Sequence, residues 1–393
     1  MSIDPQLAAY YERVARELPP PTQLDVAARR ARMEAIAQRF PAPPDRIDRR
    51  DHWLALPGRE ILVRLYRPRP GMLPALVYFH GGGWIAGSVF THDGLCAALA
   101  GDAQIAVASV HYRRPPENPF PAPNDDAYAA CEWVAANAKR LDVDPSRLAV
   151  GGDSAGAHLA AGVTLEARER RGPAIAFQLL VYPVIAPDFD TASYLRHAVT
   201  PSLTRADMIE YWHYYLPDLA TRDPRAVPMR AATFAGLPRA HVVVAALDPL
   251  RDEGVRYAEL LTQAGVATTC VETPALTHGS PAPHRSWPRR ATRNGRSAAR
   301  PVPLSYNGRM TASALGRILR GLSRRNGSSL WSDGDYLNEL PTSFSLSDEQ
   351  VPPARGPRAR SCGRRLNISA CCAIWVRRPC PLPRSPLPRI RRG

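Results

Sequence analysis

The spacing of hydrophobic positions predicts a helical start followed by a sheet whose strands alternate with helices. Asp4 and Pro5 are typical of a helix start, and apolar residues then recur at helical spacing from Leu7 to Leu18. A second helical pattern covers about 22–40 and ends at a group of prolines. Eight short runs rich in residues that favour strands follow, at about 47–55, 60–66, 75–79, 105–111, 147–151, 176–182, 241–247 and 268–273. These runs predict eight strands.

The later runs are continuously apolar, as parallel strands buried on both faces are. Helical patterns separate them at about 125–140, 155–170 and 252–264. We therefore predict an α/β fold with a mostly parallel eight-stranded sheet and helices on both faces. The aromatic and polar interval 186–225 interrupts this alternation. Together with the N-terminal helices it is expected to form a helical cap over one edge of the sheet.

Composition separates this body from the end of the chain. The first 279 residues hold 29 basic and 31 acidic residues, whereas 280–393 hold 22 Arg, 14 Pro and five acidic residues. We expect a helical cap segment over 1–45, an α/β core over 46–279 and an Arg/Pro-rich tail over 280–393. Because the tail lacks hydrophobic periodicity, we expect it to be disordered and interpret it as the product of a shifted reading frame. A basic arm that binds nucleic acid is the alternative.

The first candidate for chemistry is the run Gly-Asp-Ser-Ala-Gly at 152–156, which follows an apolar strand and precedes a helical pattern. In this strand–turn–helix context a G-x-S-x-G motif exposes a nucleophilic serine. The glycines allow the tight turn that lifts the Ser154 hydroxyl above the carboxyl edge of the sheet. A chance match is the alternative, and the context argues against it.

A second motif, His-Gly-Gly-Gly-Trp at 80–84, directly follows the strand at 75–79. Acyl transfer develops an oxyanion, and backbone N–H groups must point at it. Consecutive glycines allow the unusual dihedral angles that turn such groups inward. A plain glycine turn is the alternative, which the serine motif makes less favoured.

A serine hydroxyl needs a base to take its proton, and the base needs a carboxylate to orient it. Asp248 follows the apolar run 242–247, and His278 follows the last predicted strand. The order Ser154, Asp248, His278 is that of α/β hydrolases. Asp252 is the rival carboxylate, but its place at the start of a predicted helix suits a helix cap.

These motifs, in this order, resemble the hormone-sensitive-lipase-like branch of the α/β hydrolases, a family of bacterial carboxylesterases with H-G-G-G and G-D-S-A-G motifs. The resemblance covers about 5–279 and includes Asp-Pro-Leu-Arg-Asp-Glu-Gly from Asp248 and Asn-Pro-Phe-Pro-Ala from Asn118. It implies a serine hydrolase that cleaves carboxylic esters of short to medium acyl chain through an acyl-enzyme. It also implies that the enzyme uses no cofactor and that its partners are a small ester and water.

The resemblance assigns roles to individual residues. Ser154 is the nucleophile, His278 the general base and acid, and Asp248 the orienting carboxylate. The oxyanion hole is formed by the N–H groups of Gly82, Gly83 and Ala155. The residues that support these motifs are His80, Gly81, Gly152, Asp153 and Gly156. The candidate walls of the substrate pocket are Trp84, Tyr211 and Tyr215, with plain packing as the alternative for these aromatic residues.

The chain departs from the family at two internal sites. His111 and Arg114 bring basic groups into a loop that normally supports the active site. Where the family commonly has Gly-Asn after the motif serine, this chain has Ala157-His158. We interpret His158, one helical turn beyond Ser154, as a packed histidine and not as a rival base.

The largest departure follows the predicted base. Family members continue His-Gly-Phe and then form a closing helix, whereas this chain continues with Ser280 and a proline-rich segment. A weak apolar repeat at Ala314, Ile318 and Leu322 is the only helical pattern nearby. Family dimers often form through the last strand and helix, so a homodimer depends on that helix. A non-catalytic or inactive binding protein is the alternative function if the helix is missing.

The remaining signals are negative. We find no apolar run of signal-peptide or membrane-spanning length. Cys96, Cys131 and Cys270 are scattered and are expected to be buried thiols in a reducing compartment. We therefore expect a cytoplasmic protein without a nucleic-acid partner. No spacing of His, Cys or carboxylates predicts a metal site, and no glycine loop predicts a nucleotide site.

Overall fold

The computed structural model describes residues 2–20, 24–39, 46–280 and 312–323, all within a compact unit that spans Met1–Thr342. A second unit, Ser343–Gly393, lies outside the described residues. The strands are β1 (Asp48–Leu56), β2 (Arg59–Arg67), β3 (Leu73–Phe79), β4 (Ala106–His111), β5 (Val143–Asp153), β6 (Ile175–Val181), β7 (Arg239–Leu247) and β8 (Thr268–Thr277). The helices are α1 (Pro5–Glu17), α2 (Val26–Ala37), α3 (Asp93–Ala103), α4 (Ala122–Ala136), α5 (Ala155–Arg170), α6 (Ala192–Arg196), α7 (Arg205–Tyr215), α8 (Arg251–Gln263) and α9 (Ala312–Ser323), with a 3₁₀ turn η2 (Pro228–Arg230).

The eight strands form one sheet in the order β1-β2-β4-β3-β5-β6-β7-β8. β1 pairs with β2 and β2 with β4 in antiparallel fashion, and every other pair is parallel. The prediction of a mostly parallel eight-stranded sheet is therefore confirmed. β5 lies inside the sheet between β3 and β6, whereas β8 is an edge strand. The carboxyl ends of the parallel strands meet at one edge, which is where such sheets place ligands.

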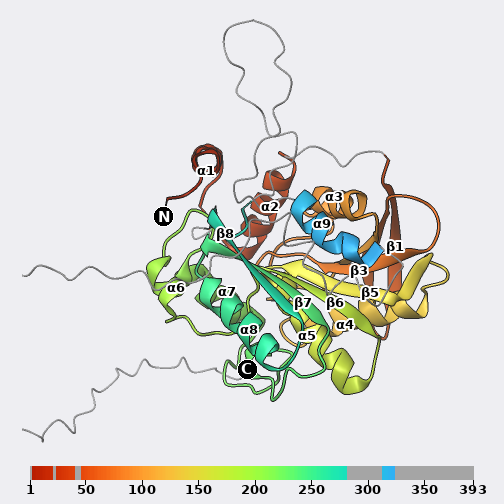
Figure 1. Ribbon diagram of the computed structural model, residues 1–393. Helices are drawn as coiled ribbons and strands as arrows, with labels where there is room; N and C mark the ends of the chain where they lie inside the picture. Colours follow the sequence, from red (N-terminus) through yellow and green to blue (C-terminus); the bar gives the residue numbers. More distant parts are fainter. Residues whose placement is uncertain (1, 21–23, 40–45, 281–311, 324–393) are drawn as a thin grey trace, which may run out of the picture. The chain divides into compact units, whose positions relative to one another are not determined.

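Helices cover both faces of the sheet (Figure 1). Alternate residues of each strand point to opposite faces, so Val77 joins the core beneath α4, α5 and α8, and Leu76 joins a second core beneath α3. All seven residues of β3 are buried as a result. This two-sided burial explains why the parallel strands lack a polar alternation.

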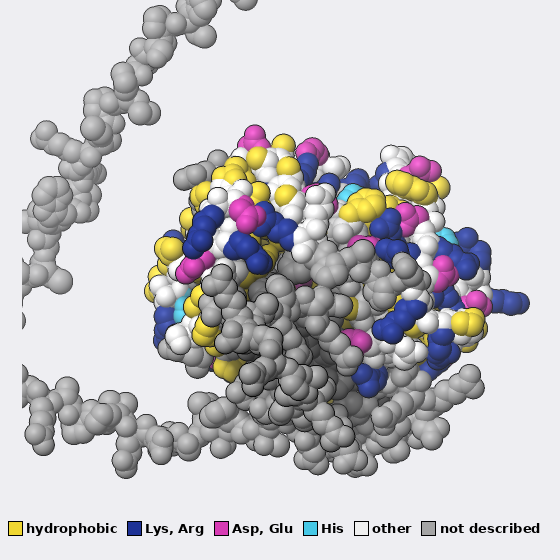
Figure 2. Space-filling model, turned by 90° about the horizontal axis from the view of Figure 1, so that it is seen from above, with side chains coloured by type: hydrophobic (Ala, Val, Ile, Leu, Met, Phe, Trp, Pro, Cys, Tyr) yellow, Lys and Arg dark blue, Asp and Glu magenta, His cyan; other side chains and the backbone are white. Residues whose placement is uncertain are grey.

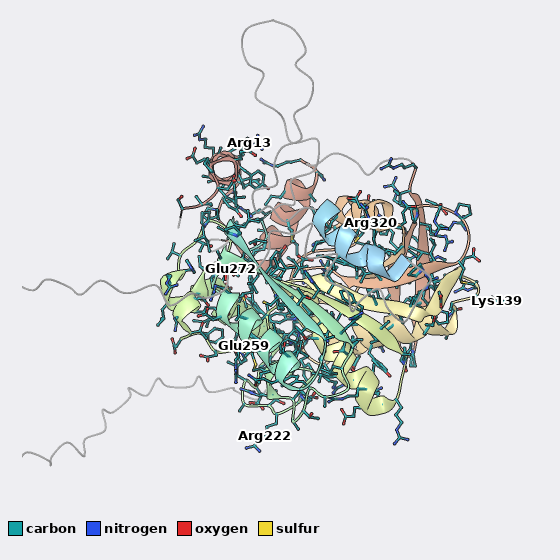
Figure 3. The ribbon with its side chains drawn as sticks, in the orientation of Figure 1. Arg13, Lys139, Arg222, Glu259, Glu272 and Arg320 are labelled. Carbon is teal, nitrogen blue, oxygen red and sulfur yellow. The ribbon has the colours of Figure 1, made fainter. Side chains whose placement is uncertain are left out.

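The helix α9 packs against α3 on the second face (Figure 3). Its Leu315 and Leu319 are buried in the same core as Leu76, and its Arg320 donates a hydrogen bond to the carbonyl of Asp102 at 2.8 Å. The weak repeat in the tail thus forms a helix that covers part of the sheet. The rest of the tail lies outside the described residues.

Two local expectations differ from the structure. The helix α3 was not predicted, because small apolar residues occupy most of its positions and leave no polar face that would reveal a helical period. Cys96 and Cys131 are buried as expected, but Cys270 is exposed. The expectation for Cys270 was wrong because β8 lies at the edge of the described sheet, where the side chains in its first half are partly or fully exposed.

The segments expected to form the cap contain α1, α2, α6 and α7. Arg29 of α2 pairs with Glu210 of α7 at 2.5 Å, and its guanidinium lies over the ring of Tyr211, 5.4 Å from the centroid. The second N-terminal helix, α2, therefore contacts the 186–225 insertion through α7. A capping box between Thr204 and Asp207 fixes the start of α7.

Candidate active site

The serine turn is formed where β5 meets α5. Ser154 has φ 55° and ψ −120°, a conformation that a non-glycine residue adopts only when its surroundings enforce it. A Cβ at Gly156 would overlap the carbonyl oxygen of Phe79, and one at Gly152 would overlap the same oxygen. The two glycines are therefore needed for the backbone of the turn to approach the end of β3. Ser154 N–H donates to the carbonyl of Val181 at 2.9 Å, which ties the turn to β6 as well.

His278 lies between the serine and a carboxylate. Its Nδ1 is 2.8 Å from Asp248 Oδ2, and its Nε2 is 2.8 Å from Ser154 Oγ. Asp248 is completely buried, and its other oxygen accepts the N–H of Leu250 at 2.9 Å. Because the carboxylate can only accept, the proton of His278 lies on Nδ1 and leaves Nε2 free to accept from the serine.

The rival carboxylate has other partners. Asp252 Oδ2 accepts the N–H of Ser193 at 2.8 Å, and Oδ1 accepts from Arg251 at 2.8 Å. It stands in the first turn of α8, as a helix-capping carboxylate does. Asp248, and not Asp252, is the carboxylate that the structure places against His278.

The glycine loop at 80–84 follows β3 and lies beside the serine turn. Gly82 and Gly83 have φ values of 122° and 59°, which favour glycine. Within the described part of the chain, the N–H groups of Gly82, Gly83 and Ala155 donate to no protein acceptor. These are the three groups that the family resemblance assigns to an oxyanion hole.

Asp153 links the serine turn to the glycine loop. Its Oδ1 accepts the N–H of Gly81 at 3.0 Å and the hydroxyl of Tyr78 at 2.7 Å, and lies 3.3 Å from His92 Nε2. Burial alone would raise the pKa of Asp153, but His92 and these hydrogen bonds outweigh burial and lower it. Asp153 is thus held as a carboxylate. Tyr78 and His92 were missed by sequence reasoning because each acts through Asp153.

The aromatic residues named as pocket candidates occupy two environments. Trp84 and Tyr215 are completely buried and stacked, with ring centroids 4.3 Å apart. Tyr211 is partly exposed and lies against the loop, since a Cβ at Gly83 would be 2.6 Å from its ring. Trp84 and Tyr215 therefore support the loop from inside, and Tyr211 is the one of the three that reaches its outer side.

His158 belongs to this internal packing, as interpreted from the sequence. Its Nδ1 accepts from the indole N–H of Trp84 at 3.3 Å, and its Nε2 donates to the carbonyl of Ala226 at 2.9 Å. Burial lowers its pKa to about 4, so the ring stays neutral. Both nitrogens are engaged, and His158 is not available as a second base.

The other residues that depart from the family pattern, His111 and Arg114, lie near the glycine loop. Burial, and then the charge of Arg114, lowers the pKa of His111 to about 4. Arg114 donates to the carbonyl of Gly87 at 2.5 Å, in the segment that follows the glycine loop. From α2, Arg30 donates to the carbonyl of Ile85 at 2.7 Å and forms a two-pronged pair with Glu117. The loop after Trp84 is therefore held by arginines on its outer side.

Glu253 is a buried carboxyl group to which the sequence analysis assigned no role, although it belongs to the Asp-Pro-Leu-Arg-Asp-Glu-Gly run. Its Oε2 accepts the N–H groups of Ile185 and Ala186 at 2.6 and 2.7 Å, and its Oε1 lies 3.3 Å from the hydroxyl of Tyr194. Burial raises its pKa to about 8. Glu253 fixes the chain after β6, close to the serine turn, where the N–H of Val184 lies 3.4 Å from the carbonyl of Ser154.

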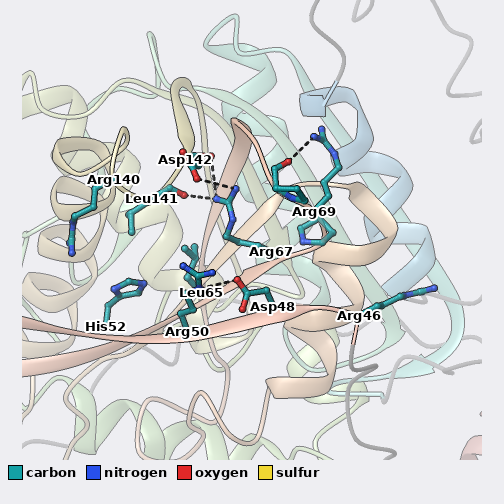
Figure 4. Close-up of a pocket in the computed structure, with 12 residues that line it drawn as sticks. Arg46, Asp48, Arg50, His52, Leu65, Arg67, Arg69, Arg140, Leu141 and Asp142 are labelled. Atoms are coloured by element: carbon teal, nitrogen blue, oxygen red, sulfur yellow. Dashed lines mark hydrogen bonds and ion pairs between the residues drawn. The ribbon is translucent and has the colours of Figure 1, made fainter.

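An arginine-lined cavity of 330 Å³ lies elsewhere, at the amino ends of the parallel strands (Figure 4). Arg67 at its centre donates to the carbonyls of Leu141 and Asp142, and Arg50 pairs with Asp48 at 2.9 Å. Basic side chains gather on the side of the molecule that carries β1 (Figure 2). None of Ser154, Asp248 and His278 lines this cavity.

Two searches of the described residues gave negative results. They contain no group of three or more His, Cys, Asp or Glu side chains placed to hold a metal ion. In the same part of the chain, no helix is long and apolar enough to cross a membrane.

Comparisons with known proteins give one family. The family described as alpha/beta hydrolase fold matches residues 76–282. The carboxylesterase NlhH of Mycobacterium tuberculosis is 43% identical over 226 residues, which are 56% of this chain and 71% of that protein. An ethyl acetate hydrolase of Pseudomonas putida is 35% identical over 292 residues, 71% of this chain and 92% of that protein. The crystal structure of a thermostable esterase from Pseudomonas putida superposes with a TM-score of 0.68 and 35% identity, covering 71% of this chain and 89% of that one.

Proposed function

This chain belongs to the α/β-hydrolase fold family, and from that premise we propose that it is a serine hydrolase that cleaves carboxylic esters. The observation that carries the proposal is the position of His278, 2.8 Å from both Asp248 and Ser154. This is the hydrogen-bonded order that activates a serine hydroxyl.

In the first half-reaction, Ser154 Oγ attacks the carbonyl carbon of the ester while His278 Nε2 takes the hydroxyl proton. The carbonyl oxygen gains the negative charge and is bound by the N–H groups of Gly82, Gly83 and Ala155. The bond to the alkoxy oxygen then breaks, and His278 gives its proton to the leaving alcohol. Asp248 stabilises the imidazolium that exists between these steps. The product is an acyl-enzyme.

In the second half-reaction, water replaces the alcohol. His278 takes a proton from the water, and the resulting hydroxide attacks the acyl carbon. The tetrahedral intermediate is bound by the same amides. Collapse of this intermediate releases the carboxylic acid and returns the proton to Ser154. Both halves use only groups of the chain and water.

We propose short to medium acyl chains as substrates and the cytoplasm as the location. The name of the related ethyl acetate hydrolase supports small esters. Tyr211 beside Gly83 is the proposed pocket wall, with Trp84 and Tyr215 behind it. The free thiols of Cys96, Cys131 and Cys270 support a reducing compartment.

The proposal is tested with p-nitrophenyl acetate, butyrate and decanoate. We expect the full chain to hydrolyse acetate and butyrate faster than decanoate, and Ser154→Ala to abolish turnover with an unchanged circular dichroism spectrum. Ser146→Ala, an exposed serine near the start of β5, is the matched control and should retain wild-type rates. Wild-type turnover by Ser154→Ala would overturn the assignment, and an inert wild-type chain would favour a binding protein on this fold.

A further inference from the structure

The N-terminal helix α1 lies over the segment that carries His278. Asp4, the N-cap of α1, donates its N–H to the carbonyl of Ala275 in β8 at 2.9 Å. The apolar side of α1, with Leu7 and Tyr10, is buried in the same core as Leu276. Figure 1 shows α1 beside the end of β8. A helix from the first 20 residues thus covers a turn more than 250 residues later in the sequence.

One polar side chain of α1 reaches this turn. The hydroxyl of Tyr11 lies 2.8 Å from Thr277 Oγ1, and Thr277 directly precedes His278. Burial raises the pKa of the Tyr11 hydroxyl, so it stays protonated and able to donate. Thr277 has a second partner in Ser280, whose Oγ accepts the N–H of Thr277 at 3.0 Å and donates to its carbonyl at 2.7 Å. The turn is therefore closed on itself by Ser280 and tied to α1 by Tyr11.

This turn needs such a tie because the sheet holds it on one side only. Among the described strands β8 is at the edge and pairs with β7 alone, and the register of that pairing shifts between Ala245 and Leu247. The backbone before His278 is also unusual, since Ala275, a residue other than glycine, has a φ of 59°. Such a backbone conformation persists only when the surrounding structure fixes it.

We propose that Tyr11 is a positioning residue for the catalytic base: its hydroxyl holds Thr277, and Thr277 holds the turn that aims His278 at Ser154. This inference rests on the proposed function, because that function makes His278 the catalytic base. The contact between α1 and the turn exists independently of it. Tyr11 does not touch the reacting atoms. Its effect is on the fraction of molecules in which Nε2 of His278 faces the serine hydroxyl.

Kinetics with p-nitrophenyl butyrate give the first test. Tyr11→Phe should lower kcat about tenfold with KM unchanged, because misplacing a reacting group by about 1 Å costs up to about 100-fold. Thr277→Val also removes the contact of Thr277 Oγ1 with Ser280 Oγ at 3.2 Å, so it should lower kcat at least as much. The double variant should be no slower than Thr277→Val, since Tyr11 acts through Thr277. Tyr10→Phe removes a hydroxyl from the neighbouring position of α1 and should keep the wild-type rate. An unchanged kcat for Tyr11→Phe, or additive losses in the double variant, would overturn the proposal.

A second readout does not depend on ester hydrolysis. The proton on His278 Nδ1, shared with Asp248, should give a low-field nuclear magnetic resonance signal that is sharp in the wild type and in Tyr10→Phe. In Tyr11→Phe we expect the signal to broaden as the turn moves and the proton exchanges with water. If the wild-type chain cleaves no ester, the proposed function fails while this signal still decides the role of Tyr11. An identical signal in wild type and Tyr11→Phe would contradict it.

Discussion

The nucleophile and the base of the proposed triad are held in very different ways. Ser154 follows β5, which has a strand on each side, and close contacts at Gly152 and Gly156 fix its turn. His278 follows β8, which has one neighbour among the described strands, and its turn depends on the N-terminal helix α1. The serine is positioned by the interior of the sheet, whereas the histidine is positioned by side chains.

Because of this difference, we expect substitutions in the two turns to have different effects. Close backbone packing leaves the serine turn almost no freedom, so a change there acts on the fold. The base turn is connected through a few hydrogen bonds, so a change there acts first on the alignment of His278. Catalysis requires both, because proton transfer depends on the distance between Ser154 and His278.

The largest expected effect comes from the carboxylate that ties the base turn to the sheet. Asp248→Asn should lower kcat about 10⁴-fold, because an amide favours the wrong tautomer of His278. The nearby Asp252→Asn is the matched control and should stay close to the wild-type rate. Initial rates with p-nitrophenyl butyrate measure both. A comparable loss in the two variants would show that the acid has been assigned to the wrong residue.

Two glycine substitutions compare the two turns directly. Gly156→Ala places a Cβ on the Phe79 carbonyl oxygen and should cost about 4 kcal/mol of unfolding free energy or more. Gly279→Ala meets no described atom within 4 Å and should cost only the strain of its positive φ, about 1–2 kcal/mol. Urea unfolding of the two variants measures the difference. Equal losses would mean that the serine turn is no more constrained than the base turn.

The helix α9 extends the rigid region, because it packs on α3 and β3, the strand that leads into the glycine loop. Leu319 is completely buried there, and Leu319→Ala should lower the unfolding free energy by about 2–5 kcal/mol. Ile318→Ala, at a partly buried neighbour, should cost less. If both variants unfold like the wild type, α9 does not cover the sheet in solution.

The smallest expected effect is a change in pH dependence. His241 on β7 is buried, its Nε2 has no hydrogen-bond partner among the described residues, and burial lowers its pKa from 6.5 to about 4. Between these values the unfolded chain binds a proton that the folded chain does not, so stability falls as pH drops from 6.5 towards 4. His241→Leu should make this fall shallower, as followed by urea unfolding at several pH values. A slope identical to that of the wild type would mean that His241 is charged in the fold.

The sequence predicted the parts of the molecule whose signals are local. The buried parallel strands follow continuous apolar runs, and Ser154, Asp248 and His278 each stand directly after the end of a strand. α3 escaped prediction because residues buried on most sides carry no helical period. The contact between Tyr11 and Thr277 was not predictable, since it joins residues 266 positions apart and neither belongs to a motif. The sequence therefore predicted the reacting groups, whereas the residues that position them could be identified only from the structure.

The most direct test of the proposed triad is the site of covalent labelling by a fluorophosphonate. The intact chain should gain one phosphonyl group, and peptide mass spectrometry should place it on Ser154. Labelling should disappear in Ser154→Ala and persist in Ser146→Ala. A chain that gains no phosphonyl group, or carries it on another residue, would contradict the assignment of Ser154 as a nucleophile activated by His278.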